Sequence, residues 1–295
     1  GMIIPVLPHL LASFYAGDVS MAAKTYGVFA AVFMLMQFIF SPVQGALSDR
    51  FGRRPVILLS NLGLGLDFIL MAVAQTLPLL FLGRVLSGIT SASFSTANAY
   101  VADVTPPEKR AAAYGKIGMA FGLGFIIAPG IGGWLGAVSL RAPFWVAAGL
   151  SLCNFCYGWF VLPESLAPEH RAAKFDWAHA HSLGSFKLLA RYPQVFGLAA
   201  VVLLINLAHY VYPSVFVLYA DYRFHWGSDM AGNTLMIVGV LAAIIQGGLI
   251  SRAIKAWGER RTLLFGLAMG TVGFTLYGLA PTGYWFWAAM PIMAM

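Results

Sequence analysis

The chain has 295 residues, of which 60% are hydrophobic and only 10% are charged, and its net charge is +7. Soluble domains carry roughly 25% charged residues, so this composition excludes an ordinary soluble domain. Long continuous apolar runs dominate the sequence and predict an all-α polytopic membrane protein.

Polar breaks divide the chain into a series of apolar segments. Eight of these are long enough to span a bilayer, and they cover 25–47, 55–75, 78–101, 112–137, 142–162, 193–220, 231–254 and 262–280. The segments at about 2–16 and 284–295 are shorter, so we expect a fragment of a longer protein with its first and tenth helices cut. The longest polar break predicts three parts: an N-terminal six-helix half at 1–162, a linker at 163–191 and a partial C-terminal half at 192–295.

Lysine and arginine are distributed unevenly along these segments. Lys24, Arg141 and Arg223 fall on one side of the predicted membrane, Arg84 lies inside it, and all the others fall on the opposite side. The positive-inside rule places that opposite side, with the linker, in the cytoplasm. The positive charge therefore indicates membrane topology, and we expect no nucleic-acid partner.

The turn between the second and third predicted helices has an ordered sequence. Residues 45–54 read Gly-Ala-Leu-Ser-Asp-Arg-Phe-Gly-Arg-Arg, which resembles the corresponding loop of major facilitator superfamily transporters. A weaker copy at 246–261, in the predicted second half, supports two repeated halves. An acid–arginine pair here can hold a cytoplasmic face closed, with Asp103 as partner for Arg53 or Arg54. The predicted gate comprises Gly45, Asp49, Arg50, Gly52, Arg53, Arg54 and Asp103; simple positive-inside anchoring is the alternative.

Two charged residues lie deep inside predicted spans. Asp67 and Arg84 are each about 10 Å from the turn that joins the third and fourth helices. Antiparallel packing would bring them level, and an unpaired charge at that depth is costly. We predict that they pair and couple a proton to transport, with a static ion pair as the alternative.

The fifth predicted helix is rich in glycine around a proline. Its small residues favour close helix packing, and Pro129 removes a backbone hydrogen bond and bends the helix. The segment resembles the antiporter motif of the superfamily's drug exporters, with Ala128 in place of a glycine. The predicted motif residues are Gly118, Gly122, Gly124, Pro129, Gly132 and Gly133.

Residues 3–8, 45–54, 82–90, 102–105 and 222–226 together resemble the tetracycline-efflux branch of the drug:proton antiporters. This resemblance covers nearly the whole chain. It implies a major facilitator fold of twelve helices in the intact protein, a bacterial inner-membrane location and export driven by inward proton flow. It implies no cofactor beyond the proton gradient.

The resemblance departs from the tetracycline exporters at two positions. Ala242 stands where they carry a histidine, and Gly270 stands where they carry an acid. Tetracycline itself therefore becomes a doubtful substrate. Polar residues that could face a central cavity and contact a substrate are Gln37, Ser95, Asn98, Asn206, His209, Tyr210 and Gln246, although each could instead make a helix–helix hydrogen bond.

The sequence thus predicts a transporter rather than an enzyme, since no metal-ligand spacing, nucleophile–base pair or phosphate loop is present. We expect proton-coupled efflux of drugs or small amphiphiles by alternating access, through a monomer in the lipid bilayer. One alternative is a metabolite or sugar-type symporter or facilitator of the same fold. Another is a non-transporting membrane protein or an inactive fragment.

Overall fold

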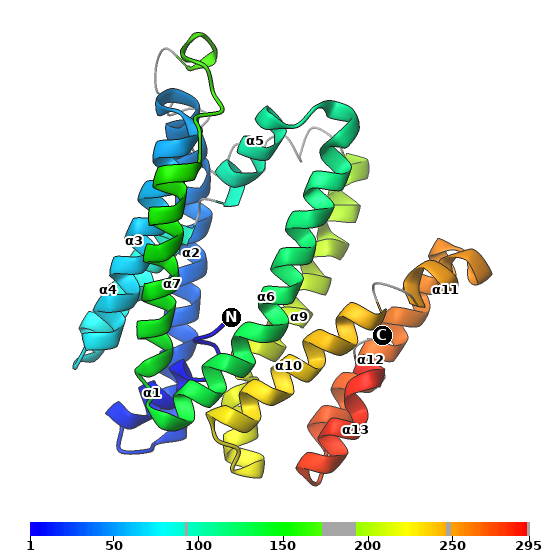
Figure 1. Cartoon of the computed structure of the whole chain (residues 1–295). Coiled ribbons are helices and arrows are strands. Elements are labelled where there is room, and N and C mark those ends of the chain that lie inside the picture. The colour runs from blue at the N-terminus through cyan, green and yellow to red at the C-terminus, as the bar shows by residue number, and fades with distance from the viewer. Residues whose placement is uncertain (92–93, 173–192, 246–248, 294–295) are drawn as a thin grey trace. The chain divides into compact units, whose positions relative to one another are not determined.

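A computed structural model of the chain describes residues 1–91, 94–172, 193–245 and 249–293 (Figure 1). Every regular element in these ranges is helical. The longer helices are α2 (Val19–Phe51), α3 (Arg53–Val73), α6 (Arg110–Val138), α7 (Ala142–Val161), α9 (Pro193–Phe224), α10 (Ser228–Ile244) and α12 (Glu259–Leu279). The shorter ones are α1 (Leu7–Phe14), α4 (Leu77–Thr90), α5 (Phe94–Val104), α11 (Ile250–Trp257) and α13 (Gly283–Met293), with 3₁₀ turns at Pro107–Lys109 and Pro168–His170.

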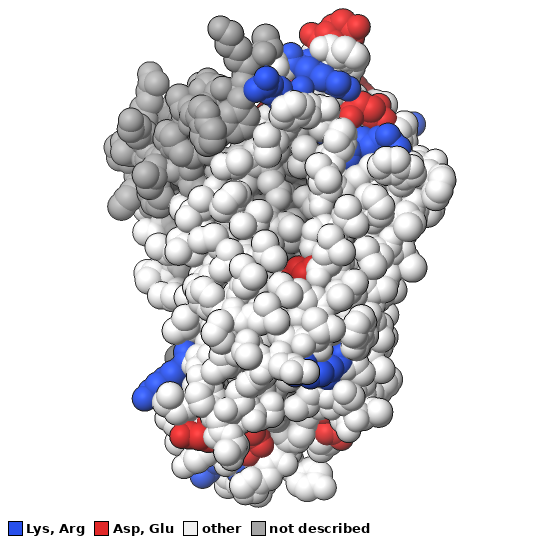
Figure 2. All heavy atoms as spheres, turned by 90° about the vertical axis from the view of Figure 1, so that its left-hand side faces the viewer, with Lys and Arg blue, Asp and Glu red and all other residues white. Residues whose placement is uncertain are grey.

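Several of these helices are long enough to span a membrane. Within the described ranges, six stretches are long and apolar enough to cross a bilayer: Val19–Phe51, Arg53–Val73, Leu77–Val104, Pro107–Val138, Ala142–Val161 and Glu259–Leu279. Charged side chains gather toward two ends of the face in Figure 2, and the band between them is almost uncharged. This distribution is the one expected when a hydrocarbon layer surrounds the middle of the helices.

Two predicted spans each include residues outside the described ranges. The predicted helix at 78–101 corresponds to α4 and α5, which lie on either side of residues 92–93, outside the described ranges. The predicted helix at 231–254 corresponds to α10 and α11, with residues 246–248 between them also outside those ranges.

Contacts among the helices divide the chain into two compact units. One unit comprises Leu7–Ile117 and Leu140–Phe216, and the other comprises Gly1–Val6, Gly118–Ser139 and Val217–Met295. Helices α6 and α9 therefore each contribute residues to both units. The division into 1–162, 163–191 and 192–295 stays a prediction.

The unit that begins at Leu7 is built on α2, α3, α4 and α7, which run side by side in Figure 1. Helix α3 packs against α4 and α7, and α2 packs against α4. Phe29, Met71, Leu80 and Phe144 are buried at these contacts. Glycine permits close backbone approach at Gly88, where a Cβ would lie 2.6 Å from the carbonyl oxygen of Phe33. These packed helices fix the position of the charged residues at their ends.

In the second unit, α6 crosses α10 at small residues. A Cβ at Gly133 would lie 3.0 Å from the Cα of Gly232 and would collide with the carbonyl oxygen of Ser228. Trp134 Nε1 donates a hydrogen bond of 2.9 Å to Asn233 Oδ1 beside this crossing. The backbones therefore touch where glycine removes the side chain, as in other close helix pairs in membranes.

The turn expected at 45–54 is shorter in the structure than the sequence predicted. Residues 45–51 complete the last turns of α2, and α3 begins at Arg53, so Gly52 alone reverses the chain. Gly52 has φ +102° and ψ 158°, a conformation essentially restricted to glycine. Because glycine has no Cβ, there is room beside Gly52 for the carboxylate of Glu164. A Cβ at this position would collide with that carboxylate.

Replacing Gly52 with alanine should destabilise the chain by about 1–3 kcal/mol, since the new Cβ meets both the strained backbone and the Glu164 carboxylate. Thermal unfolding in detergent measures the loss. Gly45→Ala is the matched control, because no described atom lies within 4 Å of a Cβ at that position. Equal unfolding temperatures for the two variants would contradict this view of Gly52.

Candidate functional site

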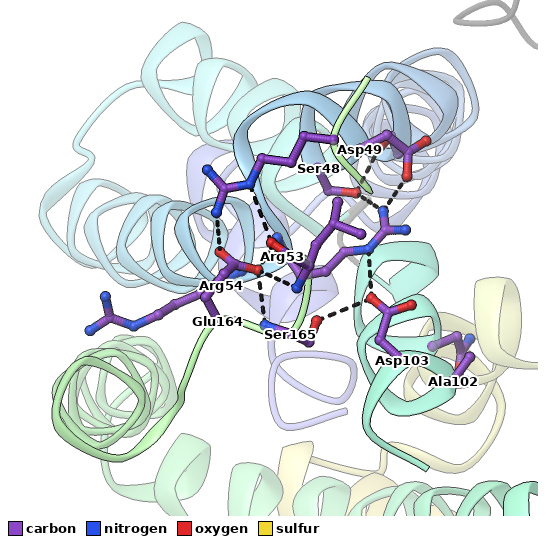
Figure 3. Close-up of polar contacts among 12 residues, drawn as sticks. Ser48, Asp49, Arg53, Arg54, Ala102, Asp103, Glu164 and Ser165 are labelled. Atoms are coloured by element: carbon purple, nitrogen blue, oxygen red, sulfur yellow. Dashed lines mark hydrogen bonds and ion pairs between the residues drawn. The ribbon is translucent and has the colours of Figure 1, made fainter. Parts of the chain in front are cut away.

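Arg53 is the centre of a charged cluster at one end of the helices. Its Nε donates to Asp103 Oδ2 at 3.2 Å, and its Nη1 donates to Ser48 Oγ at 2.7 Å and to Asp49 Oδ1 (Figure 3). The Arg53 side chain is only 12% exposed, whereas that of Asp49 is 54% exposed. A partly buried guanidinium with several acceptors holds its neighbours more firmly than a solvated surface pair does. Arg53 therefore connects the end of α2, the start of α3 and the end of α5.

Glu164, which follows α7, adds a fourth segment to this cluster. Its carboxylate accepts hydrogen bonds from the backbone N–H of Arg53 at 2.9 Å and of Arg54 at 3.3 Å. These N–H groups have no partner inside α3, and a negative charge at a helix N-terminus is favourable. Ser165 Oγ also donates to Asp103 Oδ2 at 3.1 Å. The segment after α7 thus caps α3 and contacts the acid of α5.

Glu164 was missed by the sequence analysis, which treated it as part of a polar linker. Its position directly after Pro163, at the end of an apolar helix, was the available signal. Arg110 was also missed as a structural residue. Its side chain donates to the carbonyl oxygens of Ala102 at 3.0 Å and Thr105 at 3.2 Å, and so closes the end of α5 that carries Asp103.

Other members of the predicted gate lie apart from Asp103. Arg54 Nη2 donates to the carbonyl oxygen of Trp159 at 2.6 Å, and its guanidinium lies over the Trp159 ring. The guanidinium of Arg50 lies over the ring of Phe51. The sequence allowed either Arg53 or Arg54 as the partner of Asp103, and in the structure Arg53 makes this contact. Arg54 instead joins α3 to Trp159 of α7.

Asp67 and Arg84 are buried in the packed helices α3 and α4, with exposed fractions of 1% and 8%. Asp67 Oδ2 accepts a hydrogen bond from Ser87 Oγ, and Arg84 lies over the ring of Phe33 at 4.5 Å. Asp67 Oδ1 and Arg84 Nε have no hydrogen-bond partner among the described residues, and no ion pair joins the two side chains there. Among the described residues, Asp67 and Arg84 thus contact separate partners, Ser87 and Phe33, rather than forming a direct ion pair.

The residues that were predicted to contact a substrate differ in their contacts and exposure. Gln37 Nε2 donates to the carbonyl oxygen of Ser91 at 3.4 Å, and the Asn98 carbonyl oxygen accepts from Tyr114 at 3.2 Å. Ser95 and Asn206 are exposed and have interactions of their own. Gln246 and the side chains of His209 and Tyr210 lie outside the described part of the chain. These contacts do not test a role in substrate binding, which stays a prediction.

A second glutamine of α2 was not among the predicted residues. Gln44 is 8% exposed, and its Nε2 donates at 2.5 Å to the carbonyl oxygen of Ile89 near the end of α4. Gln37 and Gln44 lie seven residues apart on one face of α2. Both therefore satisfy carbonyl oxygens where α4 ends, which favours a structural role for Gln37.

Glycines of the predicted antiporter motif differ in their contacts. No described atom lies within 4 Å of a Cβ placed at Gly118, Gly122 or Gly124. Gly132 and Gly133 contact backbone atoms of Met2 and of α10, respectively. Among the predicted motif glycines, close backbone approach is thus found at Gly132 and Gly133, beyond Pro129, while α10 also packs on Ile126 before that proline.

Helices of spanning length and a buried acid and arginine within them define a polytopic membrane protein. The sequence matches the family model of the Major Facilitator Superfamily over residues 1–295, and the chain belongs to that superfamily. It is 38% identical to the class C tetracycline resistance protein of Escherichia coli over 304 aligned residues, which cover 100% of this chain and 73% of that protein. It is also 30% identical to multidrug resistance protein 2 of Bacillus subtilis, with 92% of this chain and 67% of that protein covered.

Solved structures support the same fold. A D-xylose–proton symporter superposes with a TM-score of 0.71 at 18% identity, covering 99% of this chain and 74% of that one. The human organic anion transporter MFSD10 superposes with a TM-score of 0.65 at 24% identity, covering 99% of this chain and 80% of that one. The predicted fold and the resemblance to the tetracycline-efflux branch are confirmed, and membership of a transporter family confirms a transporter rather than an enzyme.

Replacing Glu164 with alanine should lower stability by about 0.5–2 kcal/mol, since the first N–H groups of α3 lose their acceptor. Chemical or thermal unfolding of the purified chain measures this. The control is Glu169→Ala, an exposed acid of the same segment, which should change stability by less than about 0.5 kcal/mol. If both variants unfold alike, the carboxylate of Glu164 does not cap α3.

Proposed function

We propose that this chain carries out proton-coupled efflux of drugs or small amphiphilic molecules by alternating access. The observation that carries the proposal is Asp67, an acid that is 1% exposed in a helix of membrane-spanning length. One of its carboxylate oxygens has no hydrogen-bond partner in the described part of the chain. The similarity to tetracycline and multidrug resistance proteins supports a small-molecule substrate. Ala242 and Gly270 make tetracycline itself a doubtful substrate.

Asp67 is proposed to exchange the coupling proton. A carboxyl group inside the membrane is costly when it is charged and unpaired, so a change in its contact with water changes its preferred protonation state. Ser87 holds one oxygen of Asp67, and the cationic Arg84 is buried in the neighbouring helix. A rearrangement of α3 against α4 would alter both contacts together, which couples protonation to conformation.

The Arg53 cluster is proposed to close the cytoplasmic side. Its hydrogen bonds join α2, α3, α5 and the segment after α7, so inward opening that separates these ends must break them. The cluster belongs to the turn whose sequence resembles the superfamily's gating loop. The bacterial inner membrane is the proposed location, with the linker 163–191 in the cytoplasm and the monomer as the working unit.

Asp67→Asn should abolish proton-coupled export while leaving substrate-binding residues in place. Inverted vesicles with an acidic interior are given tetracycline or an amphiphilic cationic dye, and the collapse of the pH gradient is followed. An exporter releases protons from the vesicles on addition of its substrate, a symporter moves them in the opposite sense, and a non-transporting protein moves none. Glu108→Gln, which removes an exposed acid, serves as the control; full proton-driven export by Asp67→Asn would refute the coupling role.

The proposed topology predicts opposite labelling of two exposed positions. A cysteine at His170, within the linker, should react with an impermeant maleimide only in inverted vesicles. A cysteine at Tyr284, which is 84% exposed at the start of α13, should react only in intact cells. Both variants are made after Cys153 and Cys156 are replaced by serine. Labelling of both positions from the same side would contradict the topology.

A further inference from the structure

An apolar cavity of about 410 Å³ lies between α11 and α12. Its walls include Leu249, Ala253, Trp257 and Phe265, and Arg252 contributes the charged side chain. The Trp257 ring packs edge-on against Phe265 with centroids 5.3 Å apart, which joins the two helices at one side of the cavity. The cavity lies wholly within the unit that contains Val217–Met295.

Helix α11 has the residue pattern of a helix that lies at a bilayer surface. Ile250, Ile254 and Trp257 share one face at helical spacing and are exposed, while Arg252 and Lys255 lie on the opposite side. Helix α12 has the length and composition of a membrane span and begins at Glu259, directly after the turn at Gly258. The cavity therefore lies close to the level where the hydrocarbon region meets water.

Arg252 lines this cavity, and three more cations lie within the same short stretch of chain: Lys255, Arg260 and Arg261. All are exposed, and none of them has an ion pair or hydrogen bond to the described residues. Glu259 is the one acid between residues 250 and 262. The positive charge is consequently available to a negatively charged molecule.

We propose that the cavity binds one anionic phospholipid, with acyl chain against Trp257 and Phe265 and headgroup phosphate against Arg252 and its neighbours. Both features are needed for this recognition. Positive-inside topology alone requires no cavity, and binding of a neutral lipid requires no cluster of unpaired cations. A basic pocket beside membrane-spanning helices matches the charge of an anionic headgroup and the apolar length of its chains. This inference goes beyond the transport function and does not depend on it.

Quenching of Trp257 tests the proposal in the purified, detergent-solubilised chain. Phosphatidylglycerol or phosphatidylcholine with brominated acyl chains is titrated in, and the signal of Trp257 is obtained by difference from a Trp257→Phe variant. This subtraction removes the other tryptophans of the 8 in the chain. Phosphatidylglycerol should quench Trp257 at lower concentration than phosphatidylcholine does.

Arg252→Gln should weaken the phosphatidylglycerol effect about fivefold, the change that corresponds to about 1 kcal/mol for one cation near the surface. Arg223→Gln is the matched control, because Arg223 is exposed but does not line the cavity, and it should leave the titration unchanged. Equal quenching by both lipids, or an unchanged titration for Arg252→Gln, would overturn the proposal. A dimer that protects Trp257 from both lipids would assign the cavity to a second copy and would also overturn it.

Discussion

The hydrogen bonds of the Arg53 guanidinium hold together the ends of α2, α3 and α5. The guanidinium is held by Asp49 and Ser48 of α2 and by Asp103 of α5, and the backbone N–H of Arg53 is capped by Glu164. The side chain and the backbone N–H of Arg53 donate hydrogen bonds to α2, to α5 and to the segment after α7. The start of α3 therefore cannot move without breaking several of these hydrogen bonds together. Gly52 makes this arrangement possible, since its conformation and missing Cβ let α3 start directly at Arg53.

Helix α3 links the Arg53 contacts at its start to Asp67, which lies in the predicted membrane interior. This helix runs without a described break from Arg53 to Val73, so a shift at its capped end displaces Asp67 relative to Ser87 and Arg84 in α4. A helix transmits such a shift as a rigid element. The proposed cytoplasmic gate and the proposed proton site are therefore two positions on one helix, and the breaking of one set of contacts is expected to alter the other.

Much of the fold could be predicted from the sequence, because continuous apolar runs and excluded charges identify membrane helices directly. Helices α3, α7 and α12 agree closely with the predicted spans. The contact of Asp103 with Arg53 rather than Arg54 could not be predicted, since the choice depends on the direction in which α3 leaves Gly52. Glu164 was missed because a cap at 111 residues' separation leaves no local pattern. The pairing of Asp67 with Arg84 was expected from depth alone, and depth does not reveal the contacts of Asp67 with Ser87 and of Arg84 with Phe33.

A double-mutant cycle between Arg53 and Asp103 tests the central claim, that Arg53 holds the helix ends together. The free energy of unfolding in detergent is measured for the chain, Arg53→Gln, Asp103→Asn and the double variant. Since the two side chains are only 12% and 25% exposed, a coupling energy of roughly 1–3 kcal/mol is expected. The same cycle between Arg50 and Asp103 should give a value near zero, because Arg50 lies over Phe51 instead. A coupling energy for Arg53 and Asp103 below about 0.5 kcal/mol, the size of an exposed surface pair, would contradict the account.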